Sequence, residues 1–131
     1  MIIRKTFKAE IAHRVVNAYT ERCRGLHGHS YIFEIFLEGE LDKTGMVMDF
    51  SEVKDRIGEY MDNYDHSLMI WIEDKELVDL ASKLSDRVIF TSYNLTAESM
   101  AKQIYKDIKE FIPVKSVRVH ETATGYAEYS E

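Results

Sequence analysis

The chain has 131 residues, of which 45% are apolar and 31% are charged. These values are typical of a soluble globular protein and argue against intrinsic disorder. No apolar run is longer than Leu68 to Ile72, far short of the roughly 20 residues needed to span a bilayer. Lysine and arginine number 17 and aspartate and glutamate 23, a net charge of −6 that argues against general nucleic-acid or anionic-membrane binding.

Other features of the sequence indicate one cytoplasmic domain. Cys23 is the only cysteine, so the chain cannot form an internal disulfide. The first residues, Met1 to Lys5, lack the apolar core of a signal peptide. No linker, repeat or low-complexity segment interrupts the chain, and we expect residues 1–131 to form a single domain.

The first half of the chain predicts strands. Polar and apolar residues alternate from Ile3 to His13, which is typical of a half-buried strand. A connection over Val15 to Leu26 leads to a second alternating segment, His29 to Glu40. A turn at Asp42 to Gly45 follows, with a short extended piece after it.

A helix is predicted next. Asp49 has the position of an N-cap with Glu52 reaching back to it, and apolar residues continue at helical spacing to Tyr64. The segment Asp74 to Asp86 predicts a second, short helix, and Val88 to Phe90 a strand.

The last part of the chain predicts a helix and two further extended segments. Thr96 caps a helix whose apolar stripe extends to Phe111. A long strand, Lys115 to Thr122, comes after Pro113, and the chain closes with Tyr126 to Tyr129. Two strands, then helices, then two strands indicate an α+β fold with antiparallel pairing.

Three of the five histidines are predicted to lie close together. His27 and His29 are two residues apart in extended backbone, so both rings project from one face. His13 ends the inward-facing series of the first strand, and antiparallel pairing brings it beside that pair. Three neutral imidazoles around one point make a zinc site with one open coordination position. Two histidines at this spacing are by themselves usually ordinary polar residues. Only the addition of His13 gives the metal hypothesis the same weight as that interpretation.

Cys23 lies four residues before His27 and next to Arg24. A thiol near a dication and an arginine has a lowered pKa and can act as a base. A buried structural cysteine and a fourth zinc ligand are the alternatives.

Three further residues are candidates on weaker grounds. Asp65 and His66 are adjacent, and such a pair can fix an imidazole tautomer or share a proton relay, although the dipeptide is common. Glu121 follows apolar positions of the third long strand. The pattern alone favours a solvated strand-end group there over a buried acceptor.

Motifs along nearly the whole chain resemble the 6-pyruvoyltetrahydropterin synthase superfamily, and specifically its 6-carboxytetrahydropterin synthase branch. The most specific match is Cys23-x-x-x-His27-Gly28-His29-Ser30-Tyr31, which is similar to the family's C-x-x-x-H-G-H-S-[FY]. Weaker motifs occur in the family's order: Phe7 to His13, Met48 to Phe50, Asp65 to Leu68, Thr96 to Ala101 and Val119 to Thr122. The chain departs from the pattern in having leucine in place of proline at Leu95, and in a longer stretch from Asp74 to Phe90.

The resemblance implies roles for the matched residues. His13, His27 and His29 would bind zinc, and Cys23 would be the base. Glu121 would anchor the pterin ring through two parallel hydrogen bonds, which reverses the preference for a solvated carboxylate.

Asp65 and His66 would complete the proton relay from a neighbouring subunit. The implied fold is the tunnelling fold, a four-stranded antiparallel sheet with helices on one face. Three subunits would close a β-barrel, and two trimers would stack into a homohexamer.

The implied reaction is that of a zinc-dependent lyase in queuosine biosynthesis. It converts 7,8-dihydroneopterin triphosphate to 6-carboxy-5,6,7,8-tetrahydropterin, acetaldehyde and triphosphate. The three residues between Cys23 and His27 resemble this branch. A 6-pyruvoyltetrahydropterin synthase of the biopterin path is an alternative, and a non-enzymatic, zinc-stabilised binding module is another. Candidates for holding the triphosphate are Lys5, Arg14, Arg22 and Arg24.

Overall fold

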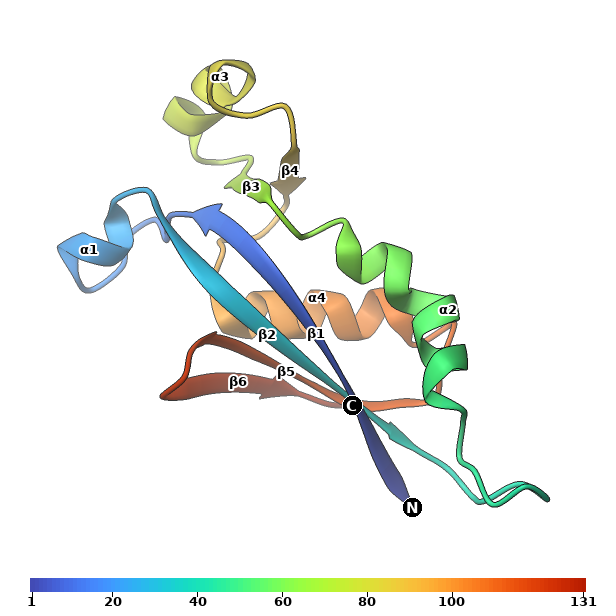
Figure 1. The fold of residues 1–131 in the computed structure, drawn as a ribbon. Coiled ribbons are helices and arrows are strands. Elements are labelled where there is room, and N and C mark those ends of the chain that lie inside the picture. Colours follow the sequence, from blue (N-terminus) through green and yellow to red (C-terminus); the bar gives the residue numbers. More distant parts are fainter.

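The structure is a computed structural model that describes residues 1–131. In chain order its elements are β1 (Ile2–His13), α1 (Glu21–Arg24), β2 (His27–Glu38), α2 (Phe50–Asp62), β3 (Ser67–Trp71), α3 (Lys75–Leu84), β4 (Val88–Thr91), α4 (Ala97–Ile108), β5 (Val114–Thr122) and β6 (Gly125–Tyr129). Figure 1 shows the long strands β1 and β2 crossing the middle of the molecule, with α4 behind them and α3 at one end. The α+β class predicted from the sequence is confirmed.

The sheet has six strands in the order β4-β3-β1-β2-β5-β6. The four strands β1, β2, β5 and β6 pair antiparallel, as predicted. The prediction of a purely antiparallel, four-stranded sheet is wrong, because β3 and β4 add a parallel extension beside β1.

The parallel extension has a physical explanation in the sequence of β3. Four of its five residues are buried, so Ser67–Trp71 lacks the period-two alternation that marks a strand with one solvated face. It joins β1 only at Ile11 and Ala12, which pair with Ser67 and Leu68. The remaining outer edge of β1 is therefore not covered by β3.

One face of the sheet packs against α2 and α4 in a single main core. Alternate residues of β1, β2 and β5 turn inward, and fully buried members include Phe33, Ile35 and Val117. On α4 the buried stripe of Met100, Ile104 and neighbours matches the predicted helical face as far as Ile108. The prediction that the stripe extends to Phe111 is wrong, because the helix ends at Ile108 and Phe111 is 59% exposed. A separate small cluster seats α3 on β3 and includes Leu68, Ile70, Leu77 and Ala81.

The helix starts are fixed by side-chain caps. The Asp49 carboxylate accepts from the Ser51 N–H at 2.7 Å, and the Thr96 hydroxyl accepts from the Ser99 N–H at 3.2 Å. The prediction that Glu52 reaches back to Asp49 is not confirmed, because Glu52 pairs with Arg56 one turn along the helix instead. Residues 46–48 form a bend and not a strand.

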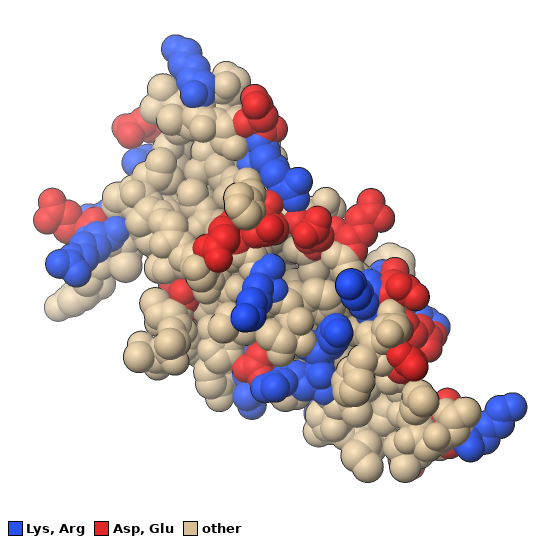
Figure 2. Space-filling view, in the orientation of Figure 1, with Lys and Arg blue, Asp and Glu red and all other residues tan.

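The helices and the surface charges agree with the composition of the chain. None of the helices combines the length and the apolar character that crossing a membrane requires. Figure 2 shows acidic and basic side chains interspersed on the visible face, without a continuous basic stripe.

Candidate metal centre and catalytic pocket

The β1–β2 pairing brings His13, His27 and His29 together. His13 lies directly opposite His27 in the antiparallel register, and Ile11 lies opposite His29. The ring centroids of the three histidines are 4.7 to 5.1 Å apart. One ring nitrogen of each lies within 4.8 Å of those of the others, which is the spacing of a group that could hold a metal ion. The convergence predicted from the sequence is therefore present in the structure.

The protonation of these imidazoles suits a divalent cation. His13 is only 1% exposed, and burial, with the neighbouring His27 and His29, lowers its pKa from 6.5 to about 3. Burial, followed by the effect of His27, also lowers the pKa of His29. Both rings are thus neutral at pH 7 and keep a lone pair for a metal.

The third imidazole is oriented by a backbone carbonyl. His27 Nδ1 lies 2.7 Å from the Gly25 carbonyl oxygen, so this nitrogen carries the proton and donates it. His27 Nε2 is then an acceptor, and it lies 3.0 Å from His29 Nε2. His29 Nε2 donates to it when no ion is bound, and a bound cation would take the place of that proton. The donor set of three imidazoles fits a metal such as zinc.

Tyr31 and Glu121 extend the centre toward β5. The Tyr31 side chain is fully buried, and its hydroxyl lies 3.2 Å from His13 Nδ1 and 3.4 Å from His13 Nε2. The same hydroxyl donates to Glu121 Oε1 at 3.4 Å. Burial raises the pKa of Glu121, and the Tyr31 hydrogen bond opposes that rise in part. Glu121 is thus partly buried beside the centre, which agrees with an acceptor and not with a solvated strand end.

Cys23 and Glu121 line one cavity, although they are far apart in the sequence. The cavity has a volume of about 430 Å³ and is also lined by Thr96, Glu98 and Tyr126. Cys23 lies in α1 and is exposed. Its sulfur does not belong to the group of converging ligand atoms, which consists of the three histidines. Cys23 therefore lies on the wall of the cavity that it shares with Glu121 and outside the converging ligand set.

Asp65 and His66 lie elsewhere in the chain. His66 Nδ1 is 3.0 Å from Asp65 Oδ2, and the other oxygen of Asp65 accepts from the Glu10 N–H at 2.8 Å. His66 has a φ of 56°, a conformation uncommon outside glycine, and its N–H donates to the Glu10 carbonyl at 2.7 Å. The pair is thereby fixed to the edge of β1.

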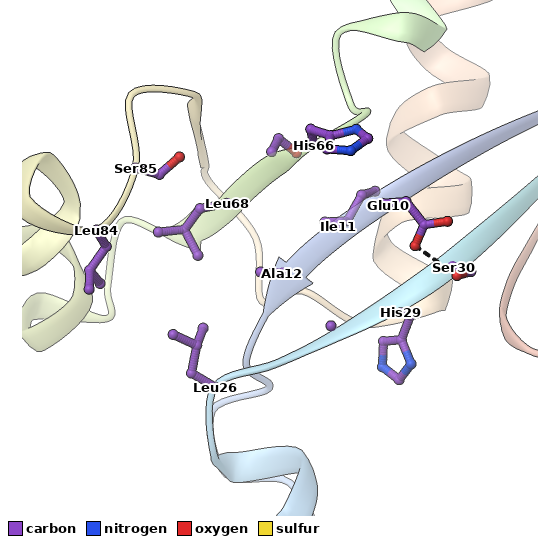
Figure 3. Close-up of a pocket in the computed structure, with 12 residues that line it drawn as sticks. Glu10, Ile11, Ala12, Leu26, His29, Ser30, His66, Leu68, Leu84 and Ser85 are labelled. Carbon is purple, nitrogen blue, oxygen red and sulfur yellow. Dashed lines mark hydrogen bonds between the residues drawn. The ribbon is translucent and has the colours of Figure 1, made fainter.

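The His66 side chain belongs to a different pocket from that of Cys23. That pocket, of about 530 Å³, is also lined by Glu10, Ser30 and Leu84. Figure 3 shows His66 near the start of β3; His29 also lines this pocket, with its ring on the far side of β2 from His66. A single chain therefore does not bring Asp65 and His66 to Cys23.

Two of the cations considered for the triphosphate already have partners. Arg14 binds Asp74 through two hydrogen bonds of 2.6 and 2.5 Å, and Arg24 donates to the Ala18 carbonyl at 2.9 Å. Arg14 thus ties the end of β1 to the start of α3.

Sequence reasoning did not single out Tyr31 or Glu98. For Tyr31 a signal was present, because residues 27, 29 and 31 share one face of an alternating strand. Glu98 reaches the Cys23 cavity only because α4 begins beside β5, and the sequence pattern does not contain that information.

Comparison with known proteins identifies the family. A family profile described as 6-pyruvoyl tetrahydropterin synthase matches residues 2–131. A 6-carboxy-5,6,7,8-tetrahydropterin synthase of Helicobacter pylori is 33% identical over 98% of this chain and 72% of its own length. The enzyme of the same name from Aquifex aeolicus is 36% identical over 98% of this chain and 97% of its own length.

Solved structures share the fold. An uncharacterized protein of Wolinella succinogenes has a TM-score of 0.82 at 22% identity, covering 100% of this chain and 98% of its own. The 6-pyruvoyl tetrahydropterin synthase of Caenorhabditis elegans has a TM-score of 0.74 at 22% identity, covering 100% and 95%. With the profile match over almost every residue, these findings establish that the chain belongs to the 6-pyruvoyl tetrahydropterin synthase family.

Proposed function

We propose that this chain is a zinc-dependent lyase that converts 7,8-dihydroneopterin triphosphate and water to 6-carboxy-5,6,7,8-tetrahydropterin, acetaldehyde and triphosphate. Curated relatives with the name of this synthase match over nearly the full chain. The observation that carries the chemistry is the three-histidine cluster beside a cavity that holds both Cys23 and Glu121.

The proposed metal site uses His13, His27 and His29 as ligands. Zinc held there would act as a Lewis acid that lowers the cost of removing a proton beside the substrate's side-chain oxygens. Three ligands leave a coordination position open, as catalytic zinc sites do, whereas structural sites are closed by four protein ligands. This ligand count favours an enzyme over the non-enzymatic, zinc-stabilised binding module.

Glu121 and Cys23 have complementary roles in the proposal. The Glu121 carboxylate would accept two hydrogen bonds from the amino-pyrimidine edge of the pterin and so fix the ring in the cavity. Cys23, on the same cavity wall, would take a proton from the substrate's side chain. Proton removal and return at that side chain are what triphosphate departure and carbon–carbon cleavage require.

Asp65 and His66 would return the proton from a neighbouring chain. Asp65 fixes the proton on His66 Nδ1, which leaves His66 Nε2 free to exchange a proton with substrate. Since His66 lines a pocket separate from that of Cys23, its role depends on a second copy.

Association into a homohexamer of two trimers is part of the proposal. Two strand edges support it: the part of β1 before Glu10 has no strand partner on its outer side, and β6 pairs only with β5. Unpaired edges of this kind are available for strand pairing with another copy. Light scattering of the purified protein gives the mass directly, and a monomer would contradict this part.

The reaction itself is tested by product analysis. Zinc-loaded protein is incubated with 7,8-dihydroneopterin triphosphate, and the products are identified by mass. Release of acetaldehyde with 6-carboxytetrahydropterin supports the proposal. A product that keeps all three side-chain carbons would instead identify a 6-pyruvoyltetrahydropterin synthase, and the absence of any product would favour a binding module.

A further inference from the structure

The hydroxyl of Tyr31 lies between the pterin anchor and the metal centre. It is within 3.4 Å of Glu121 Oε1 on one side and 3.2 Å of His13 Nδ1 on the other. Its aromatic ring is packed against Phe33 at a centroid distance of 5.8 Å and an interplanar angle of 7°. The edge of the His29 ring also contacts it, at 5.5 Å. The position of this hydroxyl is therefore fixed by packing on several sides.

A hydroxyl has one hydrogen to donate, and this fixes the direction of the chain of hydrogen bonds. Tyr31 donates to the Glu121 carboxylate, which can only accept while ionised. Its oxygen is then an acceptor toward the His13 ring, whose Nδ1 and Nε2 lie 3.2 and 3.4 Å from it.

We propose that Tyr31 is a positioning residue that joins Glu121 to His13 and so sets the place of the pterin ring relative to the metal ligands. The inference rests on the proposed function, because Glu121 is taken as the pterin anchor and His13 as a ligand. Partners behind a metal-binding histidine commonly orient the ring and fix its tautomer. Here the partner of His13 is Tyr31, which also donates to Glu121, the proposed pterin anchor.

The two contacts have different consequences when the hydroxyl is removed. Tyr31→Phe keeps the aromatic ring and its packing but deletes both hydrogen bonds. We expect the zinc dissociation constant, measured by chelator competition, to rise about tenfold, the low end for loss of an outer partner. We expect the dissociation constant of metal-free protein for 7,8-dihydroneopterin, measured by fluorescence, to rise about threefold, as for a modest hydrogen bond.

A double-mutant cycle separates the proposal from a general loss of structure. In the Glu121→Gln background, Tyr31→Phe should weaken pterin binding much less than it does in the wild type. The neutral amide oxygen of glutamine is a weaker acceptor for the Tyr31 hydroxyl than the carboxylate is. Tyr64→Phe is the matched control, since that tyrosine is also buried and its hydroxyl is hydrogen-bonded to Tyr60, outside the proposed site. It should leave both dissociation constants unchanged.

The possible results separate failure of the inference about Tyr31 from failure of the proposed function. Wild-type affinities for zinc and pterin in Tyr31→Phe would overturn the inference, as would equal losses in Tyr64→Phe or strict additivity with Glu121→Gln. If the wild-type protein converts substrate while Tyr31→Phe behaves identically, only the inference fails. If the wild type neither binds the pterin nor forms product, the proposed function fails, and the role of Tyr31 fails with it.

Discussion

Replacing Asp74 by alanine tests how the α3 segment is held to the strand that carries His13. Asp74 is 7% exposed and precedes α3, where its carboxylate caps the helix by accepting from the Leu77 N–H. The same carboxylate forms the paired hydrogen bonds with Arg14. Because Arg14 directly follows His13, Asp74→Ala separates the segment from the end of β1 without touching a proposed ligand.

The expected loss of stability follows from these two functions. Removing a helix N-cap costs about 1 kcal/mol. Hydrogen bonds to charged groups contribute about 1.5–3 kcal/mol, and the low exposure of the two side chains, 22% for Arg14 and 6% for Asp74, limits screening by solvent. Arg14 keeps Glu76 at 3.4 Å after the substitution, so it is not left without a partner. We expect a total of about 2–4 kcal/mol.

Urea unfolding of the metal-free protein at pH 7 measures this loss. With a slope of about 2 kcal/mol per molar urea, the midpoint should fall by about 1–2 M. Asp79→Ala is the matched control, because Asp79 lies exposed on the same helix, and it should change stability by no more than about 0.5 kcal/mol. A loss below about 1 kcal/mol for Asp74→Ala, or an equal loss for the control, would refute the reasoning.

The same pair of proteins has a defined pH dependence. The Arg14 hydrogen bonds, opposed in part by burial, lower the pKa of Asp74 below its ordinary value of 3.8. A carboxylate whose folded-state pKa is depressed contributes stability above its unfolded pKa, and this contribution is lost as the pH falls through the folded pKa. The difference between wild type and Asp74→Ala should therefore be constant from pH 7 to about pH 5 and shrink below pH 3.8. A difference that grows on acidification would contradict the assignment.

Three further predictions concern the proposed active site. Cys23→Ala should keep its zinc, measured by elemental analysis, and lose turnover by about 10²–10⁴-fold, the range for a general base; loss of the metal would identify Cys23 as a ligand instead. His27→Ala should reduce zinc content sharply, whereas His120→Ala, which removes a histidine bound to Glu34 on the other face of the sheet, should not; full occupancy in His27→Ala would refute the ligand set. Cys23→Ala and His66→Asn should each be inactive alone. When the two variants are mixed and allowed to exchange subunits, they should recover about one quarter of wild-type activity. In a random mixture, about one quarter of the sites combine an intact Cys23 from one copy with an intact His66 from its neighbour. No recovery would mean that Cys23 and His66 do not act across a subunit boundary.

The metal centre was predictable because it depends on short-range rules. Alternation along β2 places His27 and His29 on one face, and a hairpin-like return of the chain places His13 opposite them. The register that pairs His13 with His27 is fixed by the buried residues of both strands, since a shift by one residue would expose all of them. Local sequence therefore contains nearly all the information that this part of the site needs.

The parallel extension was not predictable by the same rules. Ser67–Trp71 is too uniformly apolar to show alternation, and its pairing with β1 spans only two residues. Its position is set by α3, which covers it, and by the contact between Asp65 and the Glu10 backbone. Both are long-range contacts, which a periodicity argument does not include.

Glu121 shows why the strand pattern gave the wrong environment for one residue. Alternation on β5 describes which face Glu121 occupies, but not what the neighbouring strand places there. The β2–β5 register pairs Ile32 with His120, so Tyr31 of β2 comes next to Glu121 near the end of β5. A tyrosine hydroxyl at that point turns a strand-end carboxylate into a hydrogen-bonded, partly buried acceptor. Tyr31 is thus what makes the environment of Glu121 differ from the prediction, because burial of a carboxylate is tolerated where a donor faces it.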